Sequence, residues 1–163
     1  MTNKTKPASI IVAMTHDGGI GKDGQLPWPK IPADMKRFRE ITETVSDPSL
    51  LNAVVMGRKT FDSLPSLAKP LKNRLNVVIS STTTLNDYPN GVLVFSSLSS
   101  AVASLNTDPA VENIFFIGGE KIYQGAVKEG LCTRAFITRI GCKDEWNCDA
   151  RFQIGRASCR ERV

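Results

Sequence analysis

Short apolar runs alternate along this chain with segments of helical pattern, and this alternation constrains the fold more than any other feature. Six runs are rich in β-branched and aromatic residues and have the length of strands buried on both faces; they span residues 9–14, 53–56, 75–79, 92–95, 114–117 and 135–140. The segments with helical pattern are residues 32–45, 58–64, 98–105 and 120–128. Strands that alternate with helices predict a single α/β domain with a mostly parallel central sheet and flanking helices.

Length and composition exclude several classes of protein. A chain of 163 residues suits one domain, and its 41% hydrophobic and 23% charged residues are ordinary for a globular protein. No apolar run approaches the roughly 20 residues that span a bilayer. The first seven residues are polar, unlike a signal peptide. We therefore predict a cytoplasmic protein that does not associate with membranes.

Charge and cysteine usage argue against nucleic acid and metal as partners. The net charge is +5, but residues 151–163 contribute four arginines and one glutamate, so most of the excess lies in the tail. Basic residues do not interleave with aromatic ones, as a nucleic-acid interface would require. The four cysteines form no C-x-x-C pair and His16 is the only histidine. We expect no metal site and interpret the cysteines as buried or idle thiols.

Asp34 interrupts the apolar face of the first expected helix. At about 100° per residue, it falls on the same arc as Met35, Phe38 and Ile41. A carboxylate that faces a core is costly unless it binds something polar, which suggests a ligand. The pattern leaves an alternative open, because an acidic residue in the first turn also stabilises a helix N-terminus.

Two strand ends carry glycines and cations immediately before expected helices. The first is Met56-Gly57-Arg58-Lys59-Thr60, and the second is Ile117-Gly118-Gly119-Glu120-Lys121-Ile122-Tyr123. Glycine allows close approach of a ligand, a helix N-terminus attracts phosphate, and open α/β sheets bind ligands outside the carboxyl ends of their strands. The alternatives are a solvated pair of charges at the first site and a simple tight turn at the second.

A third glycine-rich segment, residues 19–24, satisfies the pattern G-x-G-x-x-G of dinucleotide-binding proteins. That fingerprint requires a helix to begin at the glycines. Here Pro27, Trp28 and Pro29 follow instead, and they do not start such a helix. We therefore interpret the segment as a mobile loop that could cover a site.

These motifs, taken in order, resemble the dihydrofolate reductase family from about Ser9 to Phe152. The segments that carry the resemblance are Ile20–Trp28, Pro32–Met35, Val55–Phe61, Arg74–Ser81 and Phe116–Gly119. Trp28-Pro29 and Cys148-Asp149 resemble eukaryotic members, and fungal ones in particular. The resemblance implies NADPH-dependent reduction of 7,8-dihydrofolate to 5,6,7,8-tetrahydrofolate by hydride transfer from nicotinamide C4 to pterin C6.

The resemblance also assigns the residues on the substrate side. Asp34 would bind the pterin N3 and 2-amino group, with Thr138 hydrogen-bonded to it, while water delivers the proton to N5. Phe38 and Leu71 would flank the folate, and Arg74 would pair with its glutamate α-carboxylate. Trp28 and the glycine-rich loop would form a lid over the site. The full substrate set is Val12, Asp34, Met35, Phe38, Leu64, Leu71, Arg74, Ile117 and Thr138.

On the cofactor side, the two strand-end turns would hold the phosphates of NADPH. Arg58 and Ser81 would favour NADPH over NADH by lying near the ribose 2′-phosphate, and Tyr123 would lie near the nicotinamide. The full set is Ala13, Ile20, Gly57, Arg58, Lys59, Thr60, Ser80, Ser81, Thr82, Ile117, Gly118, Gly119, Glu120, Lys121 and Tyr123. The implied partners are dihydrofolate and antifolate inhibitors, with the chain a monomer unless it is fused to thymidylate synthase.

The resemblance ends at Phe152. We expect a reductase-like domain over residues 1–152, with the family's C-terminal pair of antiparallel strands missing, and a disordered tail of unrelated sequence over residues 153–163. One of the missing strands would pair with the strand that carries Thr138. Its absence would leave an open sheet edge. We therefore expect this chain by itself to be poorly stable, which also puts its activity in question.

Three other functions are compatible with part of the pattern. The chain could bind a nucleotide without catalysis, or it could be the N-terminal part of a reductase fused to thymidylate synthase. A riboflavin-pathway reductase would share the fold and NADPH, but Leu26-Pro27-Trp28 and Asp34 resemble the folate branch.

Overall fold

A parallel sheet of seven strands forms the centre of the computed structural model, which describes residues 5–15, 18–21, 31–140, 148, 150–152 and 160–162. The strands lie in the order β5-β4-β3-β6-β1-β7-β9, and every neighbouring pair is parallel. Their bounds are β1 Ala8–Thr15, β3 Leu51–Gly57, β4 Arg74–Ile79, β5 Leu93–Phe95, β6 Val111–Gly118, β7 Arg134–Ile140 and β9 Arg160–Arg162. The predicted α/β class and parallel sheet are confirmed.

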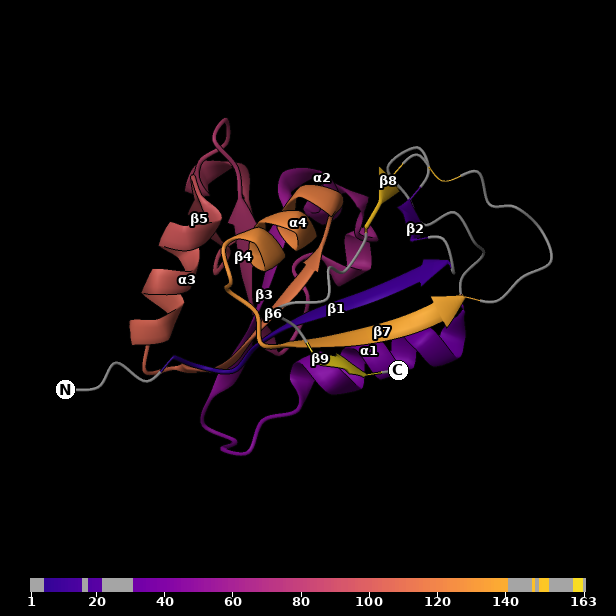
Figure 1. Cartoon of the computed structure of the whole chain (residues 1–163). Coiled ribbons are helices and arrows are strands. Elements are labelled where there is room, and N and C mark those ends of the chain that lie inside the picture. The colour runs from indigo at the N-terminus through magenta and orange to yellow at the C-terminus, as the bar shows by residue number, and fades with distance from the viewer. Residues whose placement is uncertain are drawn as a thin grey trace.

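Helices cover both faces of this sheet (Figure 1). Their bounds are α1 Pro32–Glu43, α2 Arg58–Ser63, α3 Leu98–Thr107 and α4 Glu120–Lys128, with short 3-10 turns at Ser66–Ala68 and Leu85–Asp87. Helices α3 and α4 pack with Ile10, Val12 and Phe116 in one buried cluster. Residues of α1 and α2 pack against Ile11 in a second cluster. Because side chains alternate along a strand, these clusters lie on opposite faces of the sheet. No helix in the described ranges has the length and apolar character to cross a membrane.

The predicted helices match the observed ones closely, but α3 ends two residues after its expected end at residue 105, and α1 ends two residues before its expected end at residue 45. Thr44 is already extended there. The buried Asn52 donates its side-chain amide to the carbonyl oxygens of Thr42 (3.0 Å) and Thr44 (2.8 Å), satisfying acceptors at the end of the helix. This long-range cap has no signal in the local helical pattern.

The glycine-rich segment does not open a helix in its described part. Gly19–Gly21 forms β2, which pairs antiparallel with β8, Ala150–Arg151. The residues at which the helix of a dinucleotide fingerprint would begin, from residue 22 on, lie outside the described residues, so the rejection of that fingerprint stays a prediction. The remainder of the expected lid, with Trp28, lies outside the described residues.

Two C-terminal segments pack against the rest of the fold. Phe152 is buried, its ring centroid lies 5.1 Å from that of Tyr123, and its amide donates to Gly18 O. In the tail that we expected to be disordered, residues 160–162 form β9, which pairs with β7 over Arg134–Phe136. The edge that we expected to be open is thus covered along the first half of β7. Cys132 is buried and disulfide-bonded, which corrects the interpretation of this residue as an idle thiol.

Candidate active site

The two glycine-bearing turns lie side by side at the carboxyl edge of the sheet. Met56, at the end of β3, is in register with Gly118, at the end of β6. A Cβ atom on Gly118 or on Gly119 would lie 3.5 Å from Thr60 Oγ1, so the second turn contacts the first. Gly118 has φ +132°, a conformation that side chains rarely adopt. Parallel strands thus bring together two segments that are about sixty residues apart in the chain.

These turns leave backbone donors and cations available to an anion. Neither α2 nor α4 has a side chain that caps its first turn. Lys59 and Lys121 are exposed, and Arg58 forms an exposed ion pair with Asp62, 3.8 Å between Nη1 and Oδ2. Uncapped amide groups, nearby cations and glycines that leave room for close approach suit the phosphates of a nucleotide.

Tyr123 ties the second turn to the centre of the sheet and lies within the electrostatic reach of Asp34. Its buried hydroxyl lies 3.0 Å from Ile11 O and 2.8 Å from Ile117 O, on β1 and β6. Burial raises the pKa of this hydroxyl, and the negative charge of Asp34 raises it further. Asp34 itself lies half-buried in the first turn of α1.

The apolar residues predicted for the substrate side fall into two groups. Phe38, Leu64, Leu71 and Ile117 all belong to the cluster between the sheet and helices α1 and α2. Val12 packs in the cluster on the opposite face, together with Tyr123. Met35 shares the helical arc of Phe38 but is 49% exposed, because it lies in the first turn of the helix rather than over the core.

Arg74 is enclosed at the other end of α1. Its side chain is only 5% exposed, and Nη2 lies 3.4 Å from Glu43 Oε1. Nη1 donates to Thr42 Oγ1 at 3.1 Å, and Nε donates to Lys72 O at 2.8 Å. Burial lowers the pKa of this guanidinium, Glu43 opposes that change, and the nearby Arg39 adds to it. The site thus holds one buried cation whose nearest anion is a carboxylate of the protein itself.

Thr138 has a different partner from the expected one. Its Oγ1 accepts a hydrogen bond from Arg37 Nη1 at 3.1 Å, whereas the resemblance predicted a hydrogen bond with Asp34. Thr138 lies on β7 in register with Ala13 of β1, so these two predicted site residues are neighbours. Ile20 packs beside the same core from β2.

Ser80 and Ser81 line a hollow of about 520 Å³ beyond the end of β4. The Ser80 hydroxyl accepts from the amides of Thr82 (3.3 Å) and Thr83 (3.2 Å), which shapes the turn. Ser81 and Thr82 are exposed. The hollow lies one strand away from the Gly57 turn, along the same edge of the sheet.

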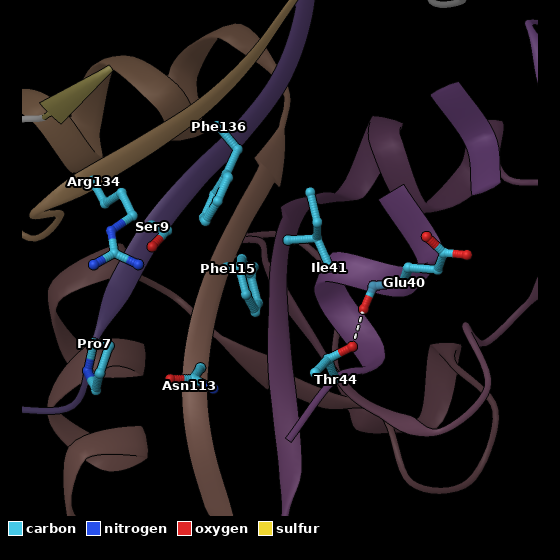
Figure 2. Close-up of a pocket in the computed structure, with 9 residues that line it drawn as sticks. All are labelled: Pro7, Ser9, Glu40, Ile41, Thr44, Asn113, Phe115, Arg134 and Phe136. Atoms are coloured by element: carbon cyan, nitrogen blue, oxygen red, sulfur yellow. Dashed lines mark hydrogen bonds between the residues drawn. The ribbon is translucent and has the colours of Figure 1, made fainter. Parts of the chain in front are cut away.

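A second hollow, of about 360 Å³, contains none of the predicted site residues (Figure 2). Ile41 of α1 and Thr44, the residue that follows this helix, line it together with Phe115 and Phe136 of the sheet. Arg134, the first residue of β7, lies at its rim, which puts the hollow towards the amino ends of the strands. Because it contains none of the predicted site residues and lies away from the two glycine-bearing turns, we do not assign the function to this hollow.

Sequence reasoning missed three residues that the structure brings to the site. A helical projection puts Thr42 on the apolar arc, yet its buried hydroxyl accepts from Arg74 and donates to Phe38 O at 2.7 Å. The same projection puts Glu43 and Arg37 on the solvent-facing arc, yet they contact Arg74 and Thr138. A helical projection separates apolar from polar positions but does not show which polar residues meet another element.

The fold defines an open α/β protein with a parallel central sheet, a class whose ligands usually bind at the carboxyl ends of the strands. Residues 8–158 match the profile of the dihydrofolate reductase family, a match that extends beyond Phe152, where the motifs placed its end. The chain is 40% identical to dihydrofolate reductase from Drosophila melanogaster over 94% of this chain and 82% of that protein. It is 42% identical to dihydrofolate reductase from Schistosoma mansoni over 88% of this chain and 76% of that one.

Fused relatives match as well. A bifunctional dihydrofolate reductase-thymidylate synthase from Daucus carota is 42% identical over 86% of this chain and 27% of its own length. The chain therefore belongs to the dihydrofolate reductase family. It is an oxidoreductase of folate metabolism that reduces dihydrofolate to tetrahydrofolate.

Proposed function

We propose that the chain binds NADPH and the pterin of 7,8-dihydrofolate at the carboxyl edge of the sheet, with the glutamate tail of the folate at Arg74. The observation that carries this proposal is the contact between the two glycine-bearing turns beside Tyr123, whose hydroxyl also feels the charge of Asp34. An acceptor for the pterin and two phosphate-binding turns then lie along one edge of the sheet.

The residues present fit the cofactor. Uncapped amides at the start of α2 and α4, with Lys59 and Lys121, suit its phosphates. The hydroxyl-lined hollow at Ser80 and Ser81 suits its adenosine end. Arg58 and Ser81 would favour the 2′-phosphate of NADPH over the 2′-hydroxyl of NADH. When bound, NADPH supplies the hydride.

The chain's own groups bind and orient the pterin. The two carboxylate oxygens of Asp34 accept from N3 and the 2-amino group, a pairing of two donors with two acceptors. Phe38 and Leu71 contact the faces of the folate and exclude water from them. Water delivers the proton to N5, and Arg74 binds the glutamate α-carboxylate of the substrate. Antifolates that carry the same donor edge would bind Asp34 in the same way. We propose that the isolated chain acts as a monomer.

Steady-state oxidation of NADPH in the presence of dihydrofolate tests this function. We expect turnover by the parent protein with NADPH preferred over NADH. Asp34→Asn should lower kcat/KM by about 10²–10⁴-fold, because the amide lacks one of the two acceptor oxygens and carries no charge. Glu40→Gln removes a charge from an exposed position of the same helix and should leave turnover unchanged.

A binding protein without catalysis would give a different result. It would quench its fluorescence with NADPH but show no turnover, and Asp34→Asn would be indistinguishable from the parent. That outcome would overturn the proposed function.

A further inference from the structure

The guanidinium of Arg74 carries a salt bridge that the proposed chemistry does not use. In the proposed function this group binds the glutamate α-carboxylate of the substrate, and the inference below rests on that assignment. Glu43 already lies beside it, 3.4 Å from Nη2, and this carboxylate is 27% exposed while the arginine is 5% exposed. Glu43 therefore stands at the rim of the site, between a buried cation and solvent.

Two other contacts hold the guanidinium without Glu43. Nε donates to the carbonyl of Lys72, and Nη1 donates to the hydroxyl of Thr42. That hydroxyl is itself fixed, because it donates to Phe38 O. Neutral acceptors on two sides therefore position Arg74, and Glu43 contributes its charge rather than the geometry.

We propose that Glu43 is an internal counterion that competes with the carboxylate tail of the substrate for Arg74 and so sets the affinity for it. Without substrate, Glu43 balances a cation that is costly to bury alone. When the substrate binds, its tail carboxylate approaches the guanidinium of Arg74 and is repelled by the negative charge of Glu43. Glu43 also neutralises part of the positive charge that would attract the tail. Arg39 adds positive charge nearby, as its effect on the pKa of Arg74 indicates. Glu43 therefore weakens the binding of ligands that carry a carboxylate tail and does not affect the binding of the pterin ring.

The proposal is tested with two ligands, dihydrofolate and 6-methyl-7,8-dihydropterin, which has the pterin ring but no tail. Dissociation constants are measured by fluorescence titration for the parent, Glu43→Gln and Glu43→Ala. Both variants should bind dihydrofolate about two- to fivefold more tightly, the change in affinity that corresponds to a partly exposed ion pair. Binding of the tail-less pterin should not change. The unliganded variants should unfold at a lower temperature than the parent, because Arg74 then lacks a counterion.

Glu40→Gln is the matched control. It removes the same charge from the same helix, at a side chain that is 59% exposed and pairs with Lys36 rather than with Arg74. It should change neither dissociation constant. The proposal is overturned if the Glu43 variants bind dihydrofolate equally or less tightly, if the tail-less pterin tightens to the same extent, or if Glu40→Gln has the same effect.

Arg74→Gln separates this inference from the proposed function. It should remove the preference of the parent for dihydrofolate over the tail-less pterin. If the preference persists, the role of Arg74 is wrong and the inference about Glu43 fails with it. If NADPH oxidation is absent in the parent while the effect of Glu43 on dihydrofolate binding is present, the catalytic proposal fails and this inference stands.

Discussion

At the scale of single residues, Tyr123 stabilises the core and also lies beside a turn of the candidate site. Its hydroxyl lies within hydrogen-bonding distance of two strand carbonyls, those of Ile11 and Ile117. Its ring packs at a tilt against the ring of Phe152. The same hydroxyl lies 3.3 Å from where a Cβ of Gly118 would stand. Tyr123 is therefore both a core residue and a neighbour of the second glycine-bearing turn.

Removing this hydroxyl should destabilise the protein through unsatisfied acceptors. Tyr123→Phe leaves the carbonyls of Ile11 and Ile117 without this donor, and we expect a loss of about 1–3 kcal/mol in the free energy of unfolding, measured in urea. The pKa of Tyr123 is raised in the folded state, so the folded protein binds its proton more tightly than the unfolded one. Its stabilising contribution is therefore present below about pH 10 and is lost as pH rises above that value.

The variant also provides the control for the pH dependence. In Tyr123→Phe, the fall in unfolding free energy above about pH 10 should be shallower than in the parent. Identical slopes in the two proteins would show that Tyr123 does not cause the alkaline loss.

At the scale of elements, the turn from β6 into α4 depends on a backbone shape that only glycine adopts readily. Gly118 has φ +132° and lies against Thr60 and the hydroxyl of Tyr123. Gly130 has φ +65° at the other end of α4, and a Cβ there would meet nothing within 4 Å. The two glycines share a positive φ and differ in whether they lie at the site.

This difference makes a matched pair of variants. Gly118→Ala and Gly130→Ala should each lower the free energy of unfolding by about 1–2 kcal/mol or more, because both force a side chain into a disfavoured conformation. Only Gly118→Ala should also weaken NADPH binding, measured by fluorescence titration of folded protein. Equal NADPH affinities in the two variants would contradict the placement of the cofactor at this turn.

At the scale of the whole molecule, the edge of the sheet beside β7 is covered over only part of its length. Strand β9 pairs with Arg134–Phe136. Within the described part of the chain, residues 137–140 have no strand on that side. An unpaired edge offers hydrogen-bond donors and acceptors to another copy of the chain.

We therefore expect the unliganded protein to be weakly stable and to associate as its concentration rises. Its thermal midpoint should fall below about 45 °C, the lower end of the range in which the midpoints of ordinary domains lie. Circular dichroism melts at several protein concentrations, combined with light scattering, provide the measurement. NADPH at about one hundred times its dissociation constant should add about 2.7 kcal/mol to folding. A sharp, reversible melt without ligand, independent of concentration, would contradict the expectation.

The local pattern of the sequence was sufficient to predict the four helices and the strands β1, β3, β4, β5, β6 and β7, but not β2, β8 or β9. Helix and strand periods are short-range properties, and a glycine at a strand end indicates its turn without reference to distant residues. The motifs around Asp34, Gly57 and Gly118, taken in order, were sufficient for the family. The roles assigned to individual site residues stay predictions.

Only the tertiary structure decided which polar groups meet. Arg37 and Thr138 are 101 residues apart, Arg74 and Thr42 are 32 apart, and neither pair follows from a helical projection. Asn52 ends α1 from a neighbouring strand, and β9 covers part of an edge expected to be open. Such contacts depend on how the elements pack, because a long polar side chain reaches whichever partner the neighbouring element presents. The sequence therefore determined the framework of helices and strands, and packing determined the partners of the charges.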